Sequence, residues 1–165
     1  MPVVLSKTMR SCIQGETPWP LFVFGPPGVG KTSGALYLLD RAAGATEYFP
    51  LGDLVERVAN AKLGRLQMHG MNTSYRITTT DLWQEWAERD ACVLDEIGMR
   101  DAPSDHECET LKMAIERRYA KPLVVVSNHA PQDLCKIYDD RIMSRLCEGT
   151  ILLVEGKDRR LAGKR

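Results

Sequence analysis

The chain has 165 residues, of which 44% are hydrophobic, and its 22 basic and 22 acidic residues give a formal net charge of zero. This length and composition suit one domain with a substantial hydrophobic core. The zero net charge excludes a global field that would draw the chain to nucleic acid or to a membrane, so any site for a polyanion must be a local patch.

Cysteine spacing and hydropathy exclude further classes of protein. The five cysteines are odd in number and none has C-x-x-C spacing, which argues against zinc knuckles and a disulfide framework. Reduced thiols in a cytoplasm fit this usage best. The aliphatic runs at residues 123–126 and 151–154 are too short to span a bilayer, and no signal-peptide pattern opens the chain. We therefore expect a soluble cytoplasmic protein with no membrane partner.

The first 20 residues predict a short helix and a linker that Pro18 and Pro20 close, and residues 21–165 predict the main domain. That domain begins with an apolar strand at residues 21–24, which runs directly into Gly-Pro-Pro-Gly-Val-Gly-Lys-Thr. A buried strand that ends in glycines and continues into a helix points several backbone N–H groups at one spot. The sequence therefore predicts a phosphate-binding loop.

Each part of this loop has a predicted contact with a nucleoside triphosphate. The glycines let the backbone approach an anion without an intervening Cβ. The Lys31 ammonium can reach the β- and γ-phosphates, and the Thr32 hydroxyl can ligate Mg²⁺. We expect ATP and Mg²⁺ as ligands, with ATP contacts from Gly25, Pro26, Pro27, Gly28, Val29, Gly30, Lys31, Thr32 and Ser33.

The middle of the chain alternates between helical and extended patterns. We expect a helix at 31–41, a strand at 46–49, a helix at 51–63, and a loop or frayed helix at 64–76. Thr80 is expected to cap the next helix, in which Trp83 and Trp86 share one apolar stripe. Their spacing suits one buried face, so both are predicted to lie in the core and not to form a platform for stacking bases.

The second half continues this alternation. Strands are expected at 91–94, 123–126 and 151–154, and helices at 104–119 and 139–146. In the first of these helices, Ser104 and Glu107 form a capping box, and Cys108, Leu111, Ile115 and Tyr119 are expected to point inward. Strands that alternate with helices at these lengths predict a parallel sheet covered on both faces.

Polar residues follow two of the predicted strands. Asp95 and Glu96 follow the strand at 91–94, and Asn128 follows the strand at 123–126. Because ligands of open parallel sheets bind at the carboxyl ends of the strands, these residues should lie beside the bound phosphates. Asp95 is placed to hold Mg²⁺ and Glu96 to act as general base, while the Asn128 amide can orient the attacking water. Alone, each of them also suits a solvated strand end or a turn.

The order of these motifs resembles the AAA+ ATPases. Val93-Leu94-Asp95-Glu96-Ile97-Gly98, Val125-Val126-Ser127-Asn128 and Asp140-Arg141-Ile142-Met143-Ser144-Arg145-Leu146 resemble the bacterial helicase-loader branch, the DnaC/DnaI and IstB-like proteins. The resemblance covers residues 18–165. It implies an α/β P-loop NTPase fold of AAA+ type, with a five-stranded parallel sheet between helices and no helical lid domain.

The same resemblance implies a function and partners. It implies ATP hydrolysis in DNA replication, single-stranded DNA as a partner, and an ATP-dependent oligomer in which Arg145 reaches the ATP of a neighbouring subunit. A replicative helicase is the further partner of such loaders, although they carry an N-terminal helicase-gripping module that this sequence does not show. The chain is therefore interpreted as an excised ATPase domain or as a short relative.

Two basic regions remain open at this stage. Lys62, Arg65, Tyr75 and Arg76 bracket a glycine-bearing loop and are candidates for contact with single-stranded DNA, or a solvated charged loop. Arg159 and Arg160 are candidates for a sensor arginine, or a solvated tail. Three other functions stay as alternatives: an IstB-like transposition helper, a small nucleotide or metabolite kinase, and a nucleotide switch that does not hydrolyse.

Overall fold

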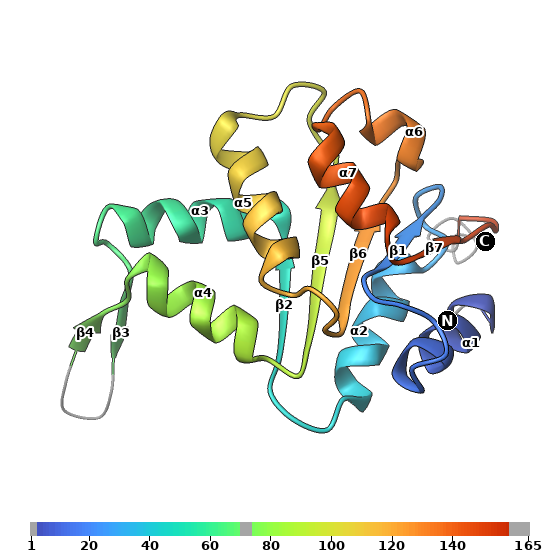
Figure 1. Ribbon diagram of the computed structural model, residues 1–165, viewed down its shortest axis with the longest axis horizontal. Helices are drawn as coiled ribbons and strands as arrows, with labels where there is room; N and C mark the ends of the chain where they lie inside the picture. Colours follow the sequence, from blue (N-terminus) through green and yellow to red (C-terminus); the bar gives the residue numbers. More distant parts are fainter. Residues whose placement is uncertain (1–2, 70–73, 159–165) are drawn as a thin grey trace, which may run out of the picture.

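The computed structural model describes residues 3–69 and 74–158 (Figure 1). Its centre is a sheet of five parallel strands in the order β2-β5-β6-β1-β7. The strands are β1 (Leu21–Phe24), β2 (Thr46–Pro50), β5 (Ala91–Ile97), β6 (Leu123–Ser127) and β7 (Thr150–Leu153). The predicted parallel α/β sheet is confirmed.

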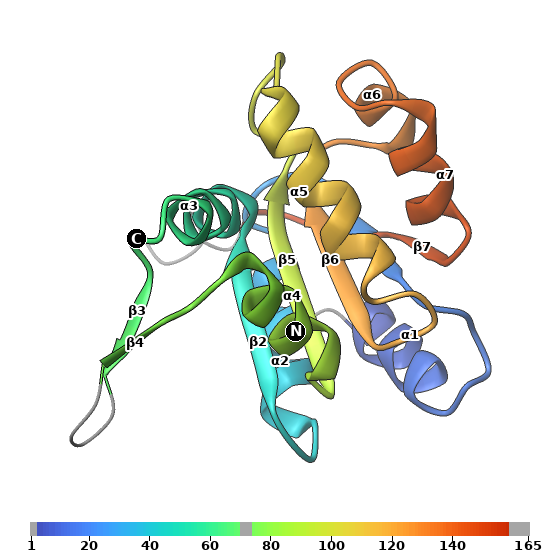
Figure 2. The same cartoon turned by 60° about the vertical axis from the view of Figure 1, so that its left-hand side comes forward.

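Helices cover both faces of this sheet, as Figure 2 shows from the side. One face carries α1 (Val3–Ile13) and α2 (Lys31–Arg41), and the other carries α3 (Leu51–Lys62), α4 (Thr79–Glu88), α5 (Asp105–Glu116) and α7 (Asp140–Cys147). The short α6 (Pro131–Leu134) has no counterpart among the predicted elements. None of the described helices is long and apolar enough to cross a membrane.

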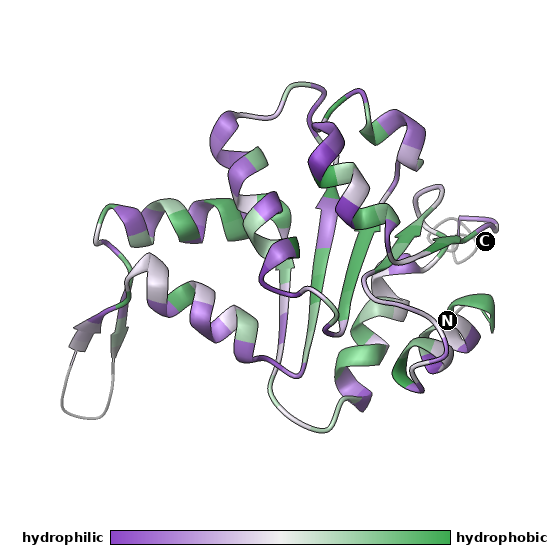
Figure 3. Cartoon of the chain, viewed as in Figure 1, coloured by the Kyte–Doolittle hydropathy of each residue, from purple (hydrophilic) through white to green (hydrophobic). Residues whose placement is uncertain are grey.

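Two hydrophobic cores result because successive side chains of a strand point to opposite faces. In β1, Leu21 and Val23 pack with α1 and α2, whereas Phe22 packs with the helices of the other face. Figure 3 shows β1 and β6 as almost uniformly hydrophobic, which is typical of central parallel strands buried on both sides. Trp83 and Trp86 are 7% and 2% exposed, so their predicted place in the core is confirmed.

In the described part of residues 64–76, which leaves out 70–73, the expected loop or frayed helix is wrong. These residues contain an antiparallel hairpin of β3 (Gln67–His69) and β4 (Ser74–Arg76), which projects from the body of the molecule in Figures 1 and 2. Met68 pairs with Tyr75 across the two strands, and the Tyr75 hydroxyl donates to Met68 Sδ at 2.8 Å. Cross-strand contacts of this kind stabilise a pair of short strands.

Two expectations at helix ends are also wrong. Thr78, not Thr80, caps α4: its Oγ1 accepts from the Asp81 N–H, and the Asp81 carboxylate accepts from the Thr78 N–H. This reciprocal pair satisfies two backbone donors, which favours the earlier start. Ser104 caps α5 as predicted, but α5 ends at Glu116, and Tyr119 is 67% exposed instead of pointing inward.

A buried arginine fastens α4 to the sheet. Arg118 is 1% exposed and donates to the backbone carbonyls of Trp86, Ala87, Arg89, Asp90 and Pro122. Burial lowers the pKa of its guanidinium from the ordinary value. These carbonyls lie at the end of α4 and beside the starts of β5 and β6. The Arg118 side chain therefore connects the C-terminal end of α4 to the N-terminal ends of these two strands.

Candidate nucleotide-binding site

The phosphate loop connects β1 to α2 with a backbone that requires glycine. Gly25, Gly28 and Gly30 have φ values of 144°, 78° and 97°, a region that L side chains rarely adopt. Gly30 is the N-cap of α2, and no side chain caps that helix end. No capping side chain therefore occupies this helix end, and the positive end of the helix dipole favours an anion there.

Lys31 is folded back across the mouth of this loop. The side chain is 6% exposed, and its ammonium donates to Gly25 O at 2.7 Å, Pro26 O at 2.8 Å and Asn128 Oδ1 at 2.8 Å. The contact with Asn128 ties the loop to the end of β6. The predicted phosphate-binding lysine and the predicted water-orienting amide are therefore in direct contact.

Asp95 and Glu96 lie within the last three residues of β5, beyond the strand end expected from the sequence. Asp95 is 4% exposed, and its carboxylate accepts from the Glu96 N–H at 2.7 Å and from the Tyr48 hydroxyl at 3.2 Å. Burial, followed by the charge of Asp95, raises the pKa of Tyr48 to about 12, so its phenol stays a proton donor to Asp95. The Asp95 carboxylate is thus held in place from two sides.

The backbone at Glu96 is strained. Glu96 has a φ of 61°, in the left-handed region, and it interrupts the regular pairing of β5 with β6 between Leu94 and Ile97. A non-glycine residue in this region costs about 1–3 kcal/mol and persists where the surroundings enforce it, often at functional sites. The twist leaves the Glu96 side chain exposed while its neighbours Asp95 and Ile97 are buried.

The three predicted motifs line one cavity of about 420 Å³. Its walls come from the loop, from the ends of β5 and β6 and from Met99: Pro27, Gly28, Gly30, Lys31, Thr32, Ser33, Asp95, Glu96, Met99, Ser127 and Asn128. The size falls within the range of about 300–1,000 Å³ that is usual for small-molecule sites. The structure therefore brings together the residues that sequence analysis predicted to bind phosphate, to bind Mg²⁺ and to orient the attacking water.

The donor set of this cavity fits a magnesium nucleotide. Thr32 supplies a hydroxyl and Asp95 a carboxylate, which are the oxygen ligands that Mg²⁺ prefers. Successive backbone N–H groups in a turn that contains such positive φ values form a concave site that suits an anion. The residues present therefore suit both the metal and the phosphates.

A second layer of contacts, which sequence analysis missed, fixes the turn after Glu96. The Ser127 hydroxyl donates to Ile97 O at 2.9 Å, and the Gly98 N–H donates to the Tyr138 hydroxyl at 3.1 Å. Tyr138 in turn donates to the buried carboxylate of Glu107 at 3.2 Å, and burial raises the pKa of its phenol. Neither Tyr48 nor Tyr138 belongs to a sequence motif. Tyr48 could have been identified only from the pairing of its strand, β2, with β5.

The segment after β7 packs against the phosphate loop. A Cβ at Gly25 would lie 2.1 Å from Val154 O, and a Cβ at Gly28 would lie 1.9 Å from Asp158 Oδ1. These approaches demand glycine independently of the backbone dihedrals. The described residues that follow β7, up to Asp158, contain no helix.

Arg145 lies away from this cavity. It is on α7, and its Nη1 is 3.1 Å from both carboxylate oxygens of Glu148, while its guanidinium lies 5.8 Å from the centre of the Tyr119 ring. With Trp19 it lines a separate surface cavity of about 390 Å³. The structure therefore does not bring Arg145 to the phosphate loop of its own chain.

The candidate DNA residues lie at the base of the hairpin and on β4. Arg65 and Arg76 are exposed, and Tyr75 is 52% exposed. Lys62 differs because its ammonium lies 3.7 Å from the Glu109 carboxylate and 3.3 Å from His106 Nδ1. The candidate sensor residues Arg159 and Arg160 lie outside the described residues.

No protein-family model and no curated protein matches the chain. Among solved structures, AMPPCP-bound DnaA from Aquifex aeolicus is similar with a TM-score of 0.73 and 19% identity, over 95% of this chain and 46% of that one. DnaA bound to AMPPCP and single-stranded DNA has a TM-score of 0.74 at 17% identity, over 94% and 46%. DnaI has a TM-score of 0.66 at 17% identity, over 93% and 84%.

These similarities establish the fold. The chain spans about half the length of the DnaA chains it matches. Its sheet and helices have the arrangement of AAA+ P-loop NTPase domains, as the sequence resemblance implied.

Proposed function

We propose that this chain is an ATP-binding and ATP-hydrolysing AAA+ domain that works in DNA replication and is related to helicase loaders. The observation that carries the proposal is the single cavity in which the phosphate loop, Asp95, Glu96 and Asn128 meet. The likeness to DnaA with a bound nucleotide analogue and to DnaI supports it. In this proposal residues 21–165 are the ATPase domain, and residues 1–20 precede it as helix and linker.

In the proposed reaction the residues have separate roles. Lys31 exchanges its loop carbonyls for oxygens of the β- and γ-phosphates, and its release frees the Asn128 amide to orient the attacking water. Thr32 and Asp95 hold Mg²⁺, which when bound neutralises charge on the phosphates. The Glu96 carboxylate accepts the proton of the attacking water.

Lys31→Ala tests the binding half of this proposal. The variant removes the ammonium that would face the phosphates, so we expect ATP affinity to fall at least about tenfold and turnover to be lost, because charge-assisted contacts are worth about 1.5–3 kcal/mol. Affinity is measured by titration with a fluorescent ATP analogue, and folding is checked by circular dichroism. Lys7→Ala, at an exposed lysine of α1, is the matched control. Unchanged ATP affinity in a folded Lys31→Ala variant would contradict the proposed role of Lys31 in phosphate binding.

We also propose that the domain binds single-stranded DNA through the hairpin and its base, in an ATP-dependent manner. Arg65, Tyr75 and Arg76 are exposed there, and basic residues beside an aromatic side chain can track a single strand. A similar DnaA structure was solved with single-stranded DNA, which supports a DNA partner for this domain.

Salt dependence tests the DNA proposal. Each neutralised phosphate of a single strand contributes a slope of about −0.7 to the plot of log affinity against log salt. Replacing Arg65 and Arg76 by alanine together should therefore flatten the slope by about 1.4 for an oligothymidine. Arg10 and Arg41, exposed on α1 and α2, form the control pair. Binding that ignores salt, or no binding in any nucleotide state, would remove nucleic acid from the proposal.

A further inference from the structure

The backbone turn that presents Glu96 contains two residues in the left-handed region. Glu96 has a φ of 61° and Gly98 a φ of 78°. A residue other than glycine keeps such a conformation only where its surroundings enforce it. The Asp95 carboxylate contributes by accepting from the Glu96 N–H at 2.7 Å. Further contacts come from residues that follow the turn by 30 or more positions along the chain.

These contacts hold both ends of one peptide group, the one that joins Ile97 to Gly98. Its carbonyl oxygen accepts from the Ser127 hydroxyl at 2.9 Å, and its N–H donates to the Tyr138 hydroxyl at 3.1 Å. A peptide group is planar, so hydrogen bonds at both ends fix its orientation. The packing is also close, because a Cβ at Gly98 would lie 2.4 Å from Leu134 Cδ2. The backbone directly after Glu96 therefore has little freedom to rotate.

A buried carboxylate orients the Tyr138 hydroxyl. Tyr138 and Glu107 are 3% and 7% exposed, and the hydroxyl donates to Glu107 Oε1 at 3.2 Å. A phenol has one proton, so donating it to Glu107 directs a lone pair of the oxygen to the Gly98 N–H. Neither Tyr138 nor Glu107 lines the nucleotide cavity. A chain of hydrogen bonds thus reaches the turn from α5, outside the cavity.

We propose that Tyr138, oriented by Glu107, is a positioning residue for the Glu96 carboxylate. This inference rests on the proposed function, in which Glu96 accepts a proton from the attacking water. By fixing the next peptide group, Tyr138 keeps Glu96 in its left-handed conformation, with the side chain at the cavity. Without the hydroxyl, this peptide group can rotate and the carboxylate moves away from the water. A displacement of about 1 Å can slow a reaction about 10²-fold.

Tyr138→Phe removes one oxygen atom and tests the proposal. We expect kcat for ATP hydrolysis to fall about 10–10²-fold while KM for ATP stays within about twofold, because the phosphate loop keeps its contacts. Both constants come from phosphate release over a range of ATP concentrations, well below Tm. Tyr37→Phe, at an exposed tyrosine of α2, is the matched control and should keep both constants. Parental kcat in folded Tyr138→Phe, or a change in KM alone, would overturn the inference.

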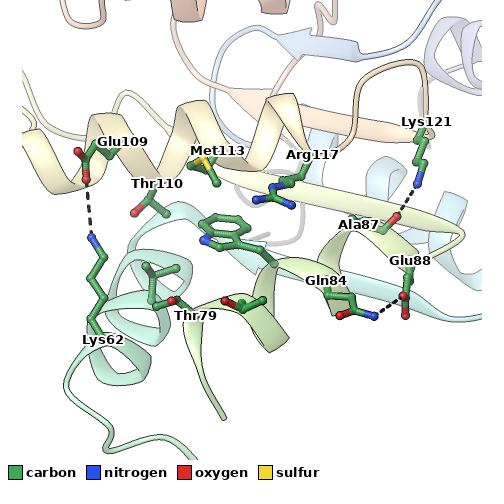
Figure 4. Close-up of a pocket in the computed structure, with 13 residues that line it drawn as sticks. Lys62, Thr79, Gln84, Ala87, Glu88, Glu109, Thr110, Met113, Arg117 and Lys121 are labelled. Atoms are coloured by element: carbon green, nitrogen blue, oxygen red, sulfur yellow. Dashed lines mark hydrogen bonds and ion pairs between the residues drawn. The ribbon is translucent and has the colours of Figure 1, made fainter.

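A stability control separates positioning from a general weakening of the fold. Met113 lies on α5, the helix of Glu107, and lines a separate cavity of about 560 Å³ between α4 and α5 (Figure 4). Met113→Ala removes contacts with the core that contains Tyr138, so it should lower Tm by several degrees while keeping kcat. If Met113→Ala slows turnover as much as Tyr138→Phe at an equal loss of Tm, Tyr138 is only a structural residue.

Glu107 gives a second test through a conservative variant. Glu107→Gln keeps an oxygen that can accept from Tyr138 and should keep kcat within about twofold, whereas Glu107→Ala should reduce kcat as Tyr138→Phe does. Glu107 also lies 3.8 Å from Arg100 Nη1, an ion pair that Glu107→Gln removes. A slow Glu107→Gln variant would assign the effect to this ion pair and contradict the proposed chain of hydrogen bonds. This comparison decides the question even if Tyr138→Phe fails to fold.

The double variant Glu96→Gln/Tyr138→Phe tests whether Tyr138 acts through Glu96. Once the base is removed its position has no value, so the double variant should be as slow as Glu96→Gln alone, within about twofold. A further 10-fold loss in the double variant would show that Tyr138 acts elsewhere. If Glu96→Gln keeps the parental rate, the proposed function fails, and this inference fails with it. A slow Glu96→Gln beside a parental Tyr138→Phe overturns this inference alone.

Discussion

Glu96→Gln is expected to bind ATP with unchanged affinity and to hydrolyse it about 10²–10⁴-fold more slowly, which is the usual contribution of a positioned general base. Glutamine keeps the length and shape of the side chain but cannot accept the proton of the attacking water. It also leaves intact the backbone bond from residue 96 to the Asp95 carboxylate. The metal ligands and the strained turn therefore survive the substitution.

The measurement separates binding from chemistry. Affinity comes from titration with a fluorescent ATP analogue, and turnover comes from phosphate release at saturating ATP. Glu56→Gln, at an exposed glutamate of α3, is the matched control and should keep the parental rate. If Glu96→Gln releases phosphate at the parental rate, Glu96 is not the base, and the role assigned to this strand end is wrong.

The sequence could predict that the motifs meet at one cavity, because this depends only on the strands being parallel. Once the strands are parallel, the ends of β1, β5 and β6 must share one edge of the sheet. Lys31, Asp95 and Asn128 therefore had to converge whatever the details of packing, and they line the same cavity. The α/β class followed equally from the alternation of apolar runs.

The contacts that hold these residues could not be predicted from patterns along the chain. Tyr48 reaches Asp95 only because β2 pairs with β5, and Tyr138 reaches Gly98 across 40 positions of sequence. Asp158 lies against Gly28 through the path of the segment after β7. Each contact depends on tertiary arrangement, for which a single sequence carries no local signal.

The wrong predictions for the cap of α4, the β3–β4 hairpin and Tyr119 each have a cause in the neighbouring sequence. Thr78 and Thr80 both precede the apolar stripe of α4, and the capping partner Asp81, three residues after Thr78, decides between them. The hairpin was missed because β3 and β4 have only three residues each, too few for an alternating pattern to stand out. Tyr119 was placed inward by extending the helical period beyond Glu116, where the helix ends.

Arg145→Ala is expected to leave ATP affinity nearly intact and to cut turnover by about 10³–10⁵-fold, which is the usual contribution of an arginine finger. The proposal is that Arg145 acts on the ATP of a neighbouring subunit. Two observations motivate it: Arg145 lies in a cavity apart from its own phosphate loop, and its side chain is 48% exposed. An exposed arginine on α7 is available to a second chain.

If Arg145 forms only a surface ion pair, its removal should have a much smaller effect on turnover. In the single chain Arg145 pairs with Glu148, whose side chain is 45% exposed, and exposed pairs of this kind are worth about 0–1 kcal/mol. If that pair is its whole role, Arg145→Ala changes stability slightly and turnover not at all. Arg141→Ala, at an exposed arginine of the same helix, is the matched control and should keep the parental rate.

Mixing two inactive variants decides whether Arg145 acts between subunits. Arg145→Ala supplies an intact base, and Glu96→Gln supplies an intact arginine, so an interface that joins the two contains every proposed group. We therefore expect an equimolar mixture to recover part of the turnover that each variant lacks alone, and specific activity of the parental protein to rise with its concentration. Specific activity that is independent of concentration, with no recovery on mixing, would show that one chain completes its own site and that Arg145 has no role in trans.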